Sequence, residues 1–142
     1  MAANADETCI FCMIIAGKIP SFKVYESDLT LAFLDISPVS EGHTQVIPKY
    51  HAKTIGDLPD EYLSDIAVIC KKVALATEVE QYNILQNNGK MAFQHVDHVH
   101  FHVIPKPSET EGLVLNIETN WPQKKPSKED LAVTLEKMKA RL

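Results

Sequence analysis

The sequence has 142 residues, of which 45% are hydrophobic and 23% are charged. This length and this balance are typical of one globular domain with a buried core. The net charge of −5 argues against general affinity for nucleic acid, and no apolar run approaches the roughly 20 residues of a membrane span. The acidic, polar N-terminus is unlike a signal peptide. We therefore expect a cytoplasmic protein, with the nucleus as a further compartment, that contacts neither membranes nor nucleic acid.

The pattern of residues along the chain predicts an α+β fold. Runs rich in β-branched and aromatic residues, bounded by turn residues, predict five strands at 22–27, 30–36, 43–49, 82–87 and 98–104. Apolar residues at helical spacing predict two longer helices over 61–78 and 127–142, with Asp60 and Ser127 as N-caps. The strands cluster into hairpins and do not alternate with the helices. This arrangement favours a mainly antiparallel sheet.

The segment HVDHVHFHVIPK, residues 95–106, carries four of the six histidines of the chain. Side chains at alternate positions of a strand share one face. His98, His100 and His102 are therefore expected about 6.5–7 Å apart on one face of the sheet. Imidazole binds metals, attacks phosphorus as a nucleophile and donates hydrogen bonds to phosphoryl oxygens. The pattern predicts either a metal site or a site for phosphoryl chemistry.

The part of this segment from 98 to 104, HVHFHVI, fits the signature His-φ-His-φ-His-φ-φ, in which φ is apolar, of the histidine triad superfamily of nucleotide hydrolases and transferases. Three further blocks resemble the same superfamily: CIFCMIIAGKIPSFKVYES, AFLDISPVSEGHTQVIPKYH and NILQNNGK. The chain most resembles the adenosine 5′-monophosphoramidase branch and is similar to its fungal members. The resemblance implies a HIT-like fold, a homodimer and hydrolysis of the P–N bond of adenosine (purine nucleoside) phosphoramidates.

The resemblance also bears on how the chain is organised. Residues 1–8 are expected to form a flexible N-terminal tail. Residues 9–142 are expected to form a single domain. Within it, residues 9–106 match the family, and residues 107–142 form a C-terminal extension that contains the last helix.

The resemblance assigns roles to individual residues. His100 would be the nucleophile that forms a covalent nucleotidyl-histidine intermediate, and the rest of the catalytic cluster would be His43, His98 and His102. Asp35 would bond the ribose hydroxyls of the nucleotide. The phosphate side of the site would contain Asn87, Gly89, Gln94 and His95. The base pocket would be formed by Ile10, Phe11, Ile14, Ile19, Phe33 and Ile36, for which core packing alone is the alternative.

His95 departs from the family pattern, because many relatives have a serine shortly before the triad where this chain has His95. An imidazole there could donate a hydrogen bond to a phosphate oxygen. It could equally point away from the nucleotide. The effect of His95 on the site is therefore open.

Cys9 and Cys12 lie in a short apolar stretch with helical spacing that stops at Gly17. A Cys-x-x-Cys pair is a redox motif in some proteins, and three cysteines in a reducing compartment argue against a disulfide framework. By resemblance, Cys9, Cys12, His51 and His98 would hold a structural zinc ion, and no organic cofactor is expected. The alternative is that both cysteines are buried thiols. The third cysteine, Cys70, is expected in the core.

Three other functions fit part of the pattern. A nucleotide-binding regulatory module would bind an adenosine monophosphate-like ligand and act through a protein partner. A dinucleoside polyphosphate hydrolase of the same superfamily is a further alternative, although the segments NNGK and AFLDISP fit that branch less well. A purely structural zinc protein would leave His43, His100 and His102 without a role.

Overall fold

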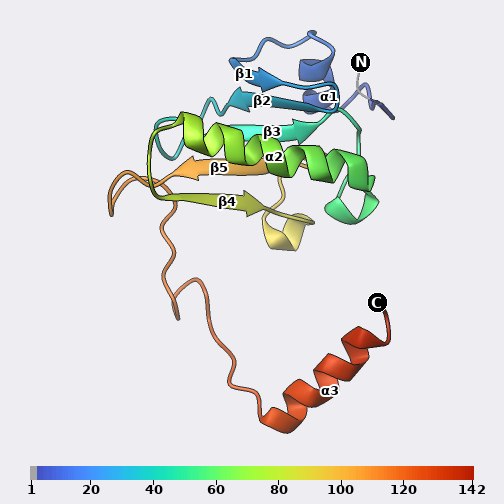
Figure 1. Ribbon diagram of the computed structural model, residues 1–142, viewed down its shortest axis with the longest axis vertical. Helices are drawn as coiled ribbons and strands as arrows, with labels where there is room; N and C mark the ends of the chain where they lie inside the picture. The colour runs from blue at the N-terminus through green and yellow to red at the C-terminus, as the bar shows by residue number, and fades with distance from the viewer. Residues whose placement is uncertain (1–2) are drawn as a thin grey trace.

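Residues 3–142 are described by a computed structural model, in which five strands form one sheet and a long helix crosses one of its faces (Figure 1). The strand order is β1-β2-β3-β5-β4, and all neighbours are antiparallel. The strands are β1 (Lys23–Glu26), β2 (Thr30–Leu34), β3 (Thr44–Pro48), β4 (Tyr82–Gln86) and β5 (Phe101–Pro105). The helices are α1 (Ile10–Ile15), α2 (Asp60–Ala76), α3 (Lys128–Lys139) and the short 3₁₀ helices η1 (Ile55–Asp57) and η2 (Lys90–Ala92). The predicted α+β class, with an antiparallel five-stranded sheet and two longer helices, is confirmed.

Helix α2 covers one face of the sheet because its apolar residues recur at helical spacing. Its buried residues include Ile66, Ile69, Cys70 and Val73. Burying an isoleucine side chain contributes about 1.5–3 kcal/mol. Cys70 is a core thiol, as predicted, and burial raises its pKa to about 12. It therefore remains protonated at neutral pH.

The two faces of the sheet belong to different cores because side chains alternate along each strand. On β2 and β3, Ala32 and Val46 face α2 and pack with its apolar stripe. Their neighbours Leu31, Phe33 and Ile47 point to the other face and pack in a second cluster with the residues of α1. The α1 face is the one that carries the histidines.

The last strand starts later than predicted, at Phe101 and not at position 98. In the register of β3 with β5, Thr44 lies opposite Val103 and Val46 lies opposite Phe101. Two residues further along this register, Val99 would lie opposite Pro48, which has no N–H to donate. The N–H of Val99 instead donates to the carbonyl oxygen of Ala52 at 2.8 Å. The first two triad histidines therefore lie in the loop that leads into the strand.

The start of α2 also differs from the prediction that Asp60 is its N-cap. Pro59 takes that position, and Asp60 is the first helical residue. In the first turn its carboxylate interacts favourably with the N-terminal end of the helix dipole. The predicted cap of α3 is confirmed, because the Ser127 hydroxyl accepts a hydrogen bond from the Asp130 N–H in a capping box.

The predicted N-terminal tail, residues 1–8, begins with two residues that lie outside the described part of the chain. Ala3 forms a parallel bridge with Tyr50, and the Asn4 side chain donates to the His51 carbonyl oxygen at 2.9 Å. These contacts bring the segment beside the loop that follows β3. Its flexibility stays a prediction.

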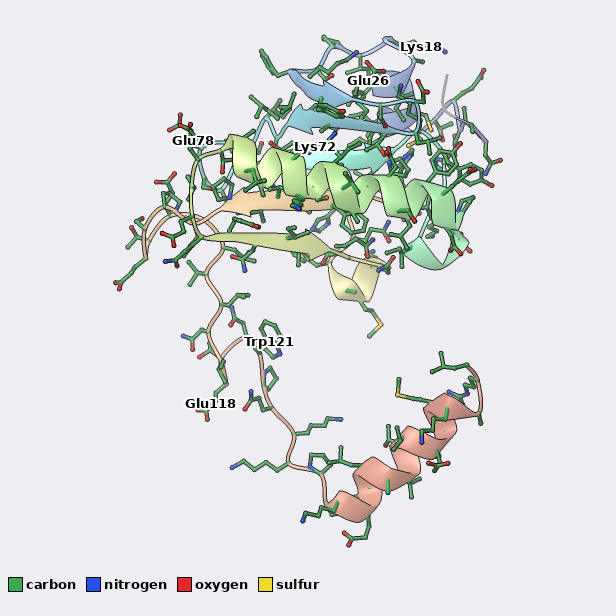
Figure 2. The ribbon with its side chains drawn as sticks, viewed as in Figure 1. Lys18, Glu26, Lys72, Glu78, Glu118 and Trp121 are labelled. Carbon is green, nitrogen blue, oxygen red and sulfur yellow. The ribbon has the colours of Figure 1, made fainter. Side chains whose placement is uncertain are left out.

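The C-terminal extension leaves the sheet and ends in α3, which stands away from the rest of the molecule (Figures 1 and 2). Every residue of α3 is exposed, and Trp121 lies on the connecting segment. No helix among residues 3–142 is long and apolar enough to cross a membrane.

Candidate active site

Two adjoining clefts lie on the α1 face of the sheet. The first, of about 760 Å³, contains the imidazoles of His43, His95, His100 and His102, and is called the histidine cleft. The second, of about 650 Å³, is called the base cleft and is lined by all six residues predicted for the base pocket: Ile10, Phe11, Ile14, Ile19, Phe33 and Ile36. The two clefts share four lining residues: Phe11, Asp35, Gln45 and Val96. They therefore form one continuous site with an apolar end and a polar end.

An apolar residue can line the base cleft and also pack in the core, so the two interpretations of these six residues do not exclude each other. Phe11 and Phe33 are buried and touch edge to face, with ring centroids 5.8 Å apart. Phe11 also contacts the rings of His98 and His100. Ile36, by contrast, is 85% exposed, so packing does not explain its position at the rim of the cleft.

His100 is held in one tautomer by the backbone. Its Nδ1 atom lies 2.7 Å from the carbonyl oxygen of His98, and a carbonyl can only accept a hydrogen bond, so Nδ1 carries the proton. The Nε2 atom of the neutral ring consequently keeps its lone pair. Burial lowers the pKa of His100, which keeps the ring neutral at neutral pH. This arrangement suits a nucleophile.

His43 and His102 form a chain of hydrogen bonds that also starts at the backbone. The N–H of Val39 donates to Nδ1 of His43 at 3.3 Å, so the proton of the neutral His43 ring is on Nε2. That Nε2 lies 2.9 Å from Nδ1 of His102 and donates to it. Nε2 of His102 therefore carries a proton that it can donate to a ligand. Burial lowers the pKa of His43, and burial together with His100 and His43 lowers that of His102 to about 4.

Asp35 follows the end of β2 and lies where the two clefts meet. Its Oδ1 accepts from the Ser37 N–H at 2.8 Å, and its Oδ2 accepts from the Gln45 amide at 2.8 Å. Burial raises the pKa of Asp35, but these two hydrogen bonds and the nearby His43 outweigh burial and lower it. A fixed, ionised carboxylate at this point can accept hydrogen bonds from a sugar.

The residues predicted for the phosphate side divide into two groups. Asn87 and His95 line the histidine cleft. Gln94 is buried, and its side chain is used by the backbone: Oε1 accepts from the Gly89 N–H, and Nε2 donates to the carbonyl oxygens of Lys53 and Val96. Gly89 and Gln94 line neither the histidine cleft nor the base cleft, and their place beside the phosphate stays a prediction. Gln94 instead braces the loop that carries His95.

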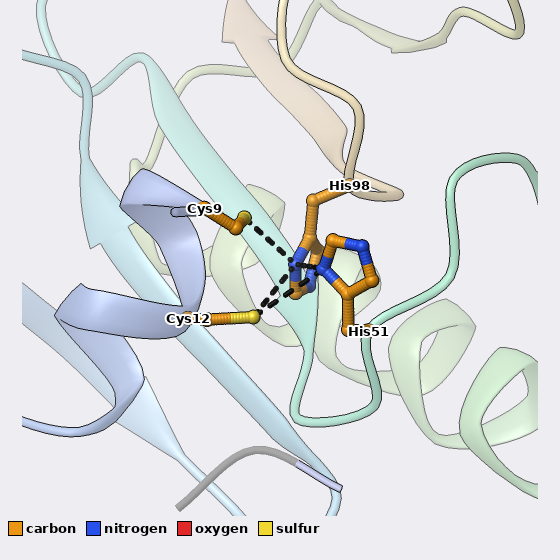
Figure 3. Close-up of side chains that lie close together, drawn as sticks. All are labelled: Cys9, Cys12, His51 and His98. Atoms are coloured by element: carbon orange, nitrogen blue, oxygen red, sulfur yellow. Dashed lines mark hydrogen bonds between the residues drawn. The ribbon is translucent and has the colours of Figure 1, made fainter. Parts of the chain in front are cut away.

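A second cluster is formed by Cys9, Cys12, His51 and His98 (Figure 3). Nδ1 of His98 lies 3.5 Å from Sγ of Cys9, 3.6 Å from Sγ of Cys12 and 3.2 Å from Nδ1 of His51. Sγ of Cys12 lies 3.3 Å from Nδ1 of His51. Zn–N bonds of about 2.0–2.1 Å and Zn–S bonds of about 2.3 Å give tetrahedral edges of roughly 3.3–3.8 Å. The four residues therefore fit a tetrahedral zinc ion.

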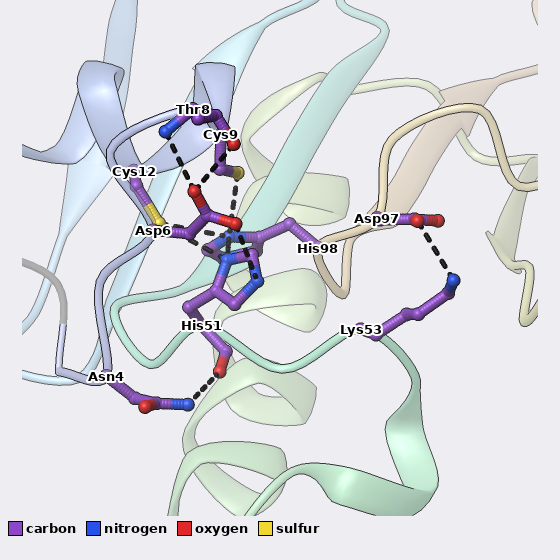
Figure 4. Close-up of polar contacts among 9 residues, drawn as sticks. All are labelled: Asn4, Asp6, Thr8, Cys9, Cys12, His51, Lys53, Asp97 and His98. Atoms are coloured by element: carbon purple, nitrogen blue, oxygen red, sulfur yellow. Dashed lines mark hydrogen bonds and ion pairs between the residues drawn. The ribbon is translucent and has the colours of Figure 1, made fainter.

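Neighbouring groups contact the two histidines of this cluster (Figure 4). Nε2 of His98 lies 3.0 Å from the carbonyl oxygen of Pro48, so it carries the proton and leaves Nδ1 free to bind a metal. The Asp6 carboxylate lies 4.0 Å from Nε2 of His51 and is itself held by Thr8. Cys12 is buried, which raises its pKa to about 11. At neutral pH this thiol is therefore protonated unless a cation stabilises the thiolate.

Comparison with known proteins agrees with this geometry. The HIT domain matches residues 16–109 of the chain. The chain belongs to the HIT, or histidine triad, family. It is 52% identical to adenosine 5′-monophosphoramidase HNT1 of Saccharomyces cerevisiae over 120 residues, which cover 84% of this chain and 73% of that protein. It is 48% identical to the hnt1 protein of Schizosaccharomyces pombe, an adenosine 5′-monophosphoramidase by name, with 95% and 98% covered.

Solved HIT-family structures have the same fold. A histidine triad nucleotide-binding protein from Candida albicans superposes with a TM-score of 0.87 at 44% identity, with 94% of this chain and 96% of that chain covered. A HIT-family member from Bacillus subtilis also gives 0.87, at 41% identity, with 96% and 98% covered. Because the coverage extends beyond residue 107, the likeness includes the C-terminal extension.

Some groups at this HIT site were not predicted. Gln45 lies between the two clefts, and the backbone groups of Val39, Pro48 and His98 fix the ring protons of the histidines. Gln45 gave one signal, because it is polar whereas Ile47, two residues further along the same strand, is apolar. Backbone groups carry no signal in the sequence.

Proposed function

We propose that this HIT protein hydrolyses the P–N bond of adenosine 5′-monophosphoramidate and related purine nucleoside phosphoramidates. The observation that carries the proposal is the His100 ring, whose Nδ1 proton is bound by the His98 carbonyl oxygen, so that Nε2 is free to attack. The names of the fungal relatives, adenosine 5′-monophosphoramidases, support this substrate. The apolar base cleft next to Asp35 and the histidines suits a nucleotide.

The reaction has two displacements at phosphorus. Nε2 of His100 forms a bond to phosphorus while the P–N bond breaks, and the nitrogen leaves as an amine after gaining a proton. Water then attacks the same phosphorus, the bond to His100 breaks, and nucleoside monophosphate is released. The proton that the amine gains is balanced by the proton that the attacking water loses.

His102 stabilises charge during both steps. Its Nε2–H, fixed by the hydrogen bond from His43, is available to a non-bridging phosphoryl oxygen as negative charge develops there. Asn87 and His95 line the same cleft and supply further polar groups around the phosphate. Asp35 accepts hydrogen bonds from the ribose at the junction of the clefts.

Hydrolysis of adenosine 5′-phosphoramidate by wild type and by His100→Ala tests the proposal. We expect the variant to fold and to lose several-thousand-fold in kcat/KM, which corresponds to about 5 kcal/mol of transition-state stabilisation. A folded wild type that binds adenosine monophosphate tightly without hydrolysis would indicate the regulatory module. A much higher kcat/KM for dinucleoside polyphosphates would indicate the other hydrolase.

We also propose that Cys9, Cys12, His51 and His98 hold a structural zinc ion. Four protein ligands leave no open position for an activated water, so the ion would act on stability and not on the chemical step. It would tie the start of α1 to the loop that carries the triad.

The homodimer and the cytoplasmic location are likewise proposals. The apolar residues Leu131, Leu135 and Met138 recur along one side of α3 and are each at least 50% exposed. A second copy of the chain would remove this surface from water. The reduced state of all three cysteines suits the cytoplasm or the nucleus.

A further inference from the structure

Gln45 is in the middle of β3, on the face of the sheet that carries the histidines. It lies directly opposite Phe33 of β2 on one side and opposite His102 of β5 on the other. Residues opposite each other on neighbouring strands place their side chains together on one face. Gln45 is thus between an aromatic residue of the base cleft and a histidine of the triad, and it lines both clefts.

The position of Gln45 between the two clefts corresponds to the sugar of a nucleotide ligand. In a nucleoside 5′-phosphate the sugar lies between the base and the phosphate. Of the four residues shared by the two clefts, Phe11 and Val96 are apolar, whereas Asp35 and Gln45 carry polar side chains. These two side chains are therefore the ones placed to meet the sugar hydroxyls.

The orientation of the Gln45 amide follows from its contact with Asp35. An ionised carboxylate can only accept, so the amide end that lies 2.8 Å from Oδ2 of Asp35 is Nε2. The other end, Oε1, is buried and has no hydrogen-bond partner within residues 3–142. An unpaired buried acceptor destabilises the fold, and an apolar side chain of the same size would avoid that cost. Packing therefore does not explain a glutamine at this position.

Gln45 also affects how Asp35 is shared between its neighbours. Oδ2 of Asp35 is 3.7 Å from Nε2 of His43, which is too long for a hydrogen bond, and His43 donates to His102 instead. By occupying Oδ2, the Gln45 amide holds the carboxylate in a fixed orientation. The Ser37 N–H holds the other oxygen.

We propose that Gln45 is a specificity-determining residue that, together with Asp35, selects ribonucleotides over 2′-deoxyribonucleotides. Its Nε2 orients Asp35, and its Oε1 accepts a hydrogen bond from a ribose hydroxyl after a small rotation about the soft terminal torsion of the side chain. The ribose hydroxyl thereby gives the buried acceptor its missing partner. This inference rests on the proposed function only in that the ligand is a nucleoside 5′-phosphate.

The test compares ribose and deoxyribose ligands in wild type and Gln45→Met. Calorimetry gives Kd for adenosine monophosphate and 2′-deoxyadenosine monophosphate, and kinetics give kcat/KM for the corresponding phosphoramidates. Wild type should favour the ribose form, and Gln45→Met should reduce that preference by roughly fivefold to tenfold, as expected for one hydrogen bond to a buried group. A purely structural role of Gln45 would weaken both ligands equally and leave the preference unchanged.

Gln81→Met is the matched control, because Gln81 is exposed and lines neither cleft. It should keep the wild-type preference. Gln45→Leu gives a second reading if Gln45→Met does not fold. Equal affinity of wild type for the two nucleotides, or no affinity for either, would overturn the proposal, as would an unchanged preference in the folded variants. A wild type without hydrolysis whose ribose preference is lost in the Gln45 variants would refute the proposed function and leave this inference standing.

Discussion

Nε2 of His43 lies 2.9 Å from Nδ1 of His102, and this contact decides which nitrogen of His102 can donate into the histidine cleft. The backbone N–H of Val39 donates to Nδ1 of His43, so the proton of the His43 ring is on Nε2. A backbone amide keeps its proton at any physiological pH. The Val39 N–H therefore fixes which nitrogen of His43, and in turn which nitrogen of His102, carries the proton. The result is a fixed donor on His102 beside the free lone pair of His100.

This relationship predicts different effects for two substitutions of His43. The amide of His43→Gln can still donate to Nδ1 of His102, whereas His43→Leu cannot. We expect kcat to fall roughly tenfold in the glutamine variant and roughly 100-fold or more in the leucine variant, as for the loss of a group that supports transition-state charge. KM and the affinity for adenosine monophosphate should change little in either. Equal losses of kcat in the two variants would contradict a role for the hydrogen bond from His43 to His102.

The buried histidines predict that stability falls as the pH falls. The pKa of His102 is lowered from 6.5 to about 4, so below pH 6.5 the unfolded chain binds a proton that the folded chain does not. Between roughly pH 7.5 and pH 5 this shift costs about 2 kcal/mol of unfolding free energy. Urea unfolding of wild type and His102→Gln across this range measures it. The variant should lose less stability on acidification, and parallel pH curves would refute the prediction.

The four-residue cluster predicts a large effect of metal removal on stability and a small one on turnover. Chelation should lower Tm by roughly 10 °C or more, because four deprotonated ligands are held together only while the cation is bound. Cys12→Ser should have the same effect in the absence of chelator. By contrast, kcat should change by less than about threefold, since the ion has no open position.

Cys70→Ala serves as the control for that experiment. Cys70 is a buried thiol outside the cluster, so the variant should still contain zinc and should still be destabilised by chelation. Metal analysis of the purified proteins provides the independent reading. Wild type that lacks zinc and melts at the same temperature with and without chelator would exclude the zinc proposal.

Ile36 offers a test of the base cleft that is separate from folding. Its side chain is 85% exposed, so Ile36→Ala should change the unfolding free energy by less than about 0.5 kcal/mol. Loss of apolar contact with the base should raise Kd for adenosine monophosphate roughly threefold to tenfold. Val68→Ala, on the outer side of α2, removes a comparable exposed side chain and should leave Kd unchanged.

The C-terminal extension predicts the assembly state. Deleting residues 107–142 should convert the proposed dimer to a monomer, because it removes the exposed apolar side of α3. Sedimentation equilibrium of the full chain and the deletion variant measures this. A full chain that is monomeric at micromolar concentration would rule out the homodimer.

Local patterns in the sequence were sufficient for much of this protein. The five strands and two longer helices follow from hydrophobic periodicity, and the alternation of histidines with apolar residues identified the segment that supplies three imidazoles to the histidine cleft. The cap of α3 at Ser127 also follows from local chemistry, because the capping hydrogen bonds join residues three apart. The late start of β5 could not be predicted, because it depends on where Pro48 falls in a register set by a distant strand.

The sequence by itself determined which residue types are available, and the family resemblance assigned most of the cleft residues and the possible zinc ligands. Only the tertiary structure decided which nitrogen of each histidine carries the proton, because the backbone partners come from Val39 and His98 and have no sequence signature. It also decided that Gln94 braces a loop and that Gln45 meets Asp35 between the clefts. A hydrogen bond depends on distance and direction between groups far apart in the chain, and those are fixed only when the sheet has formed.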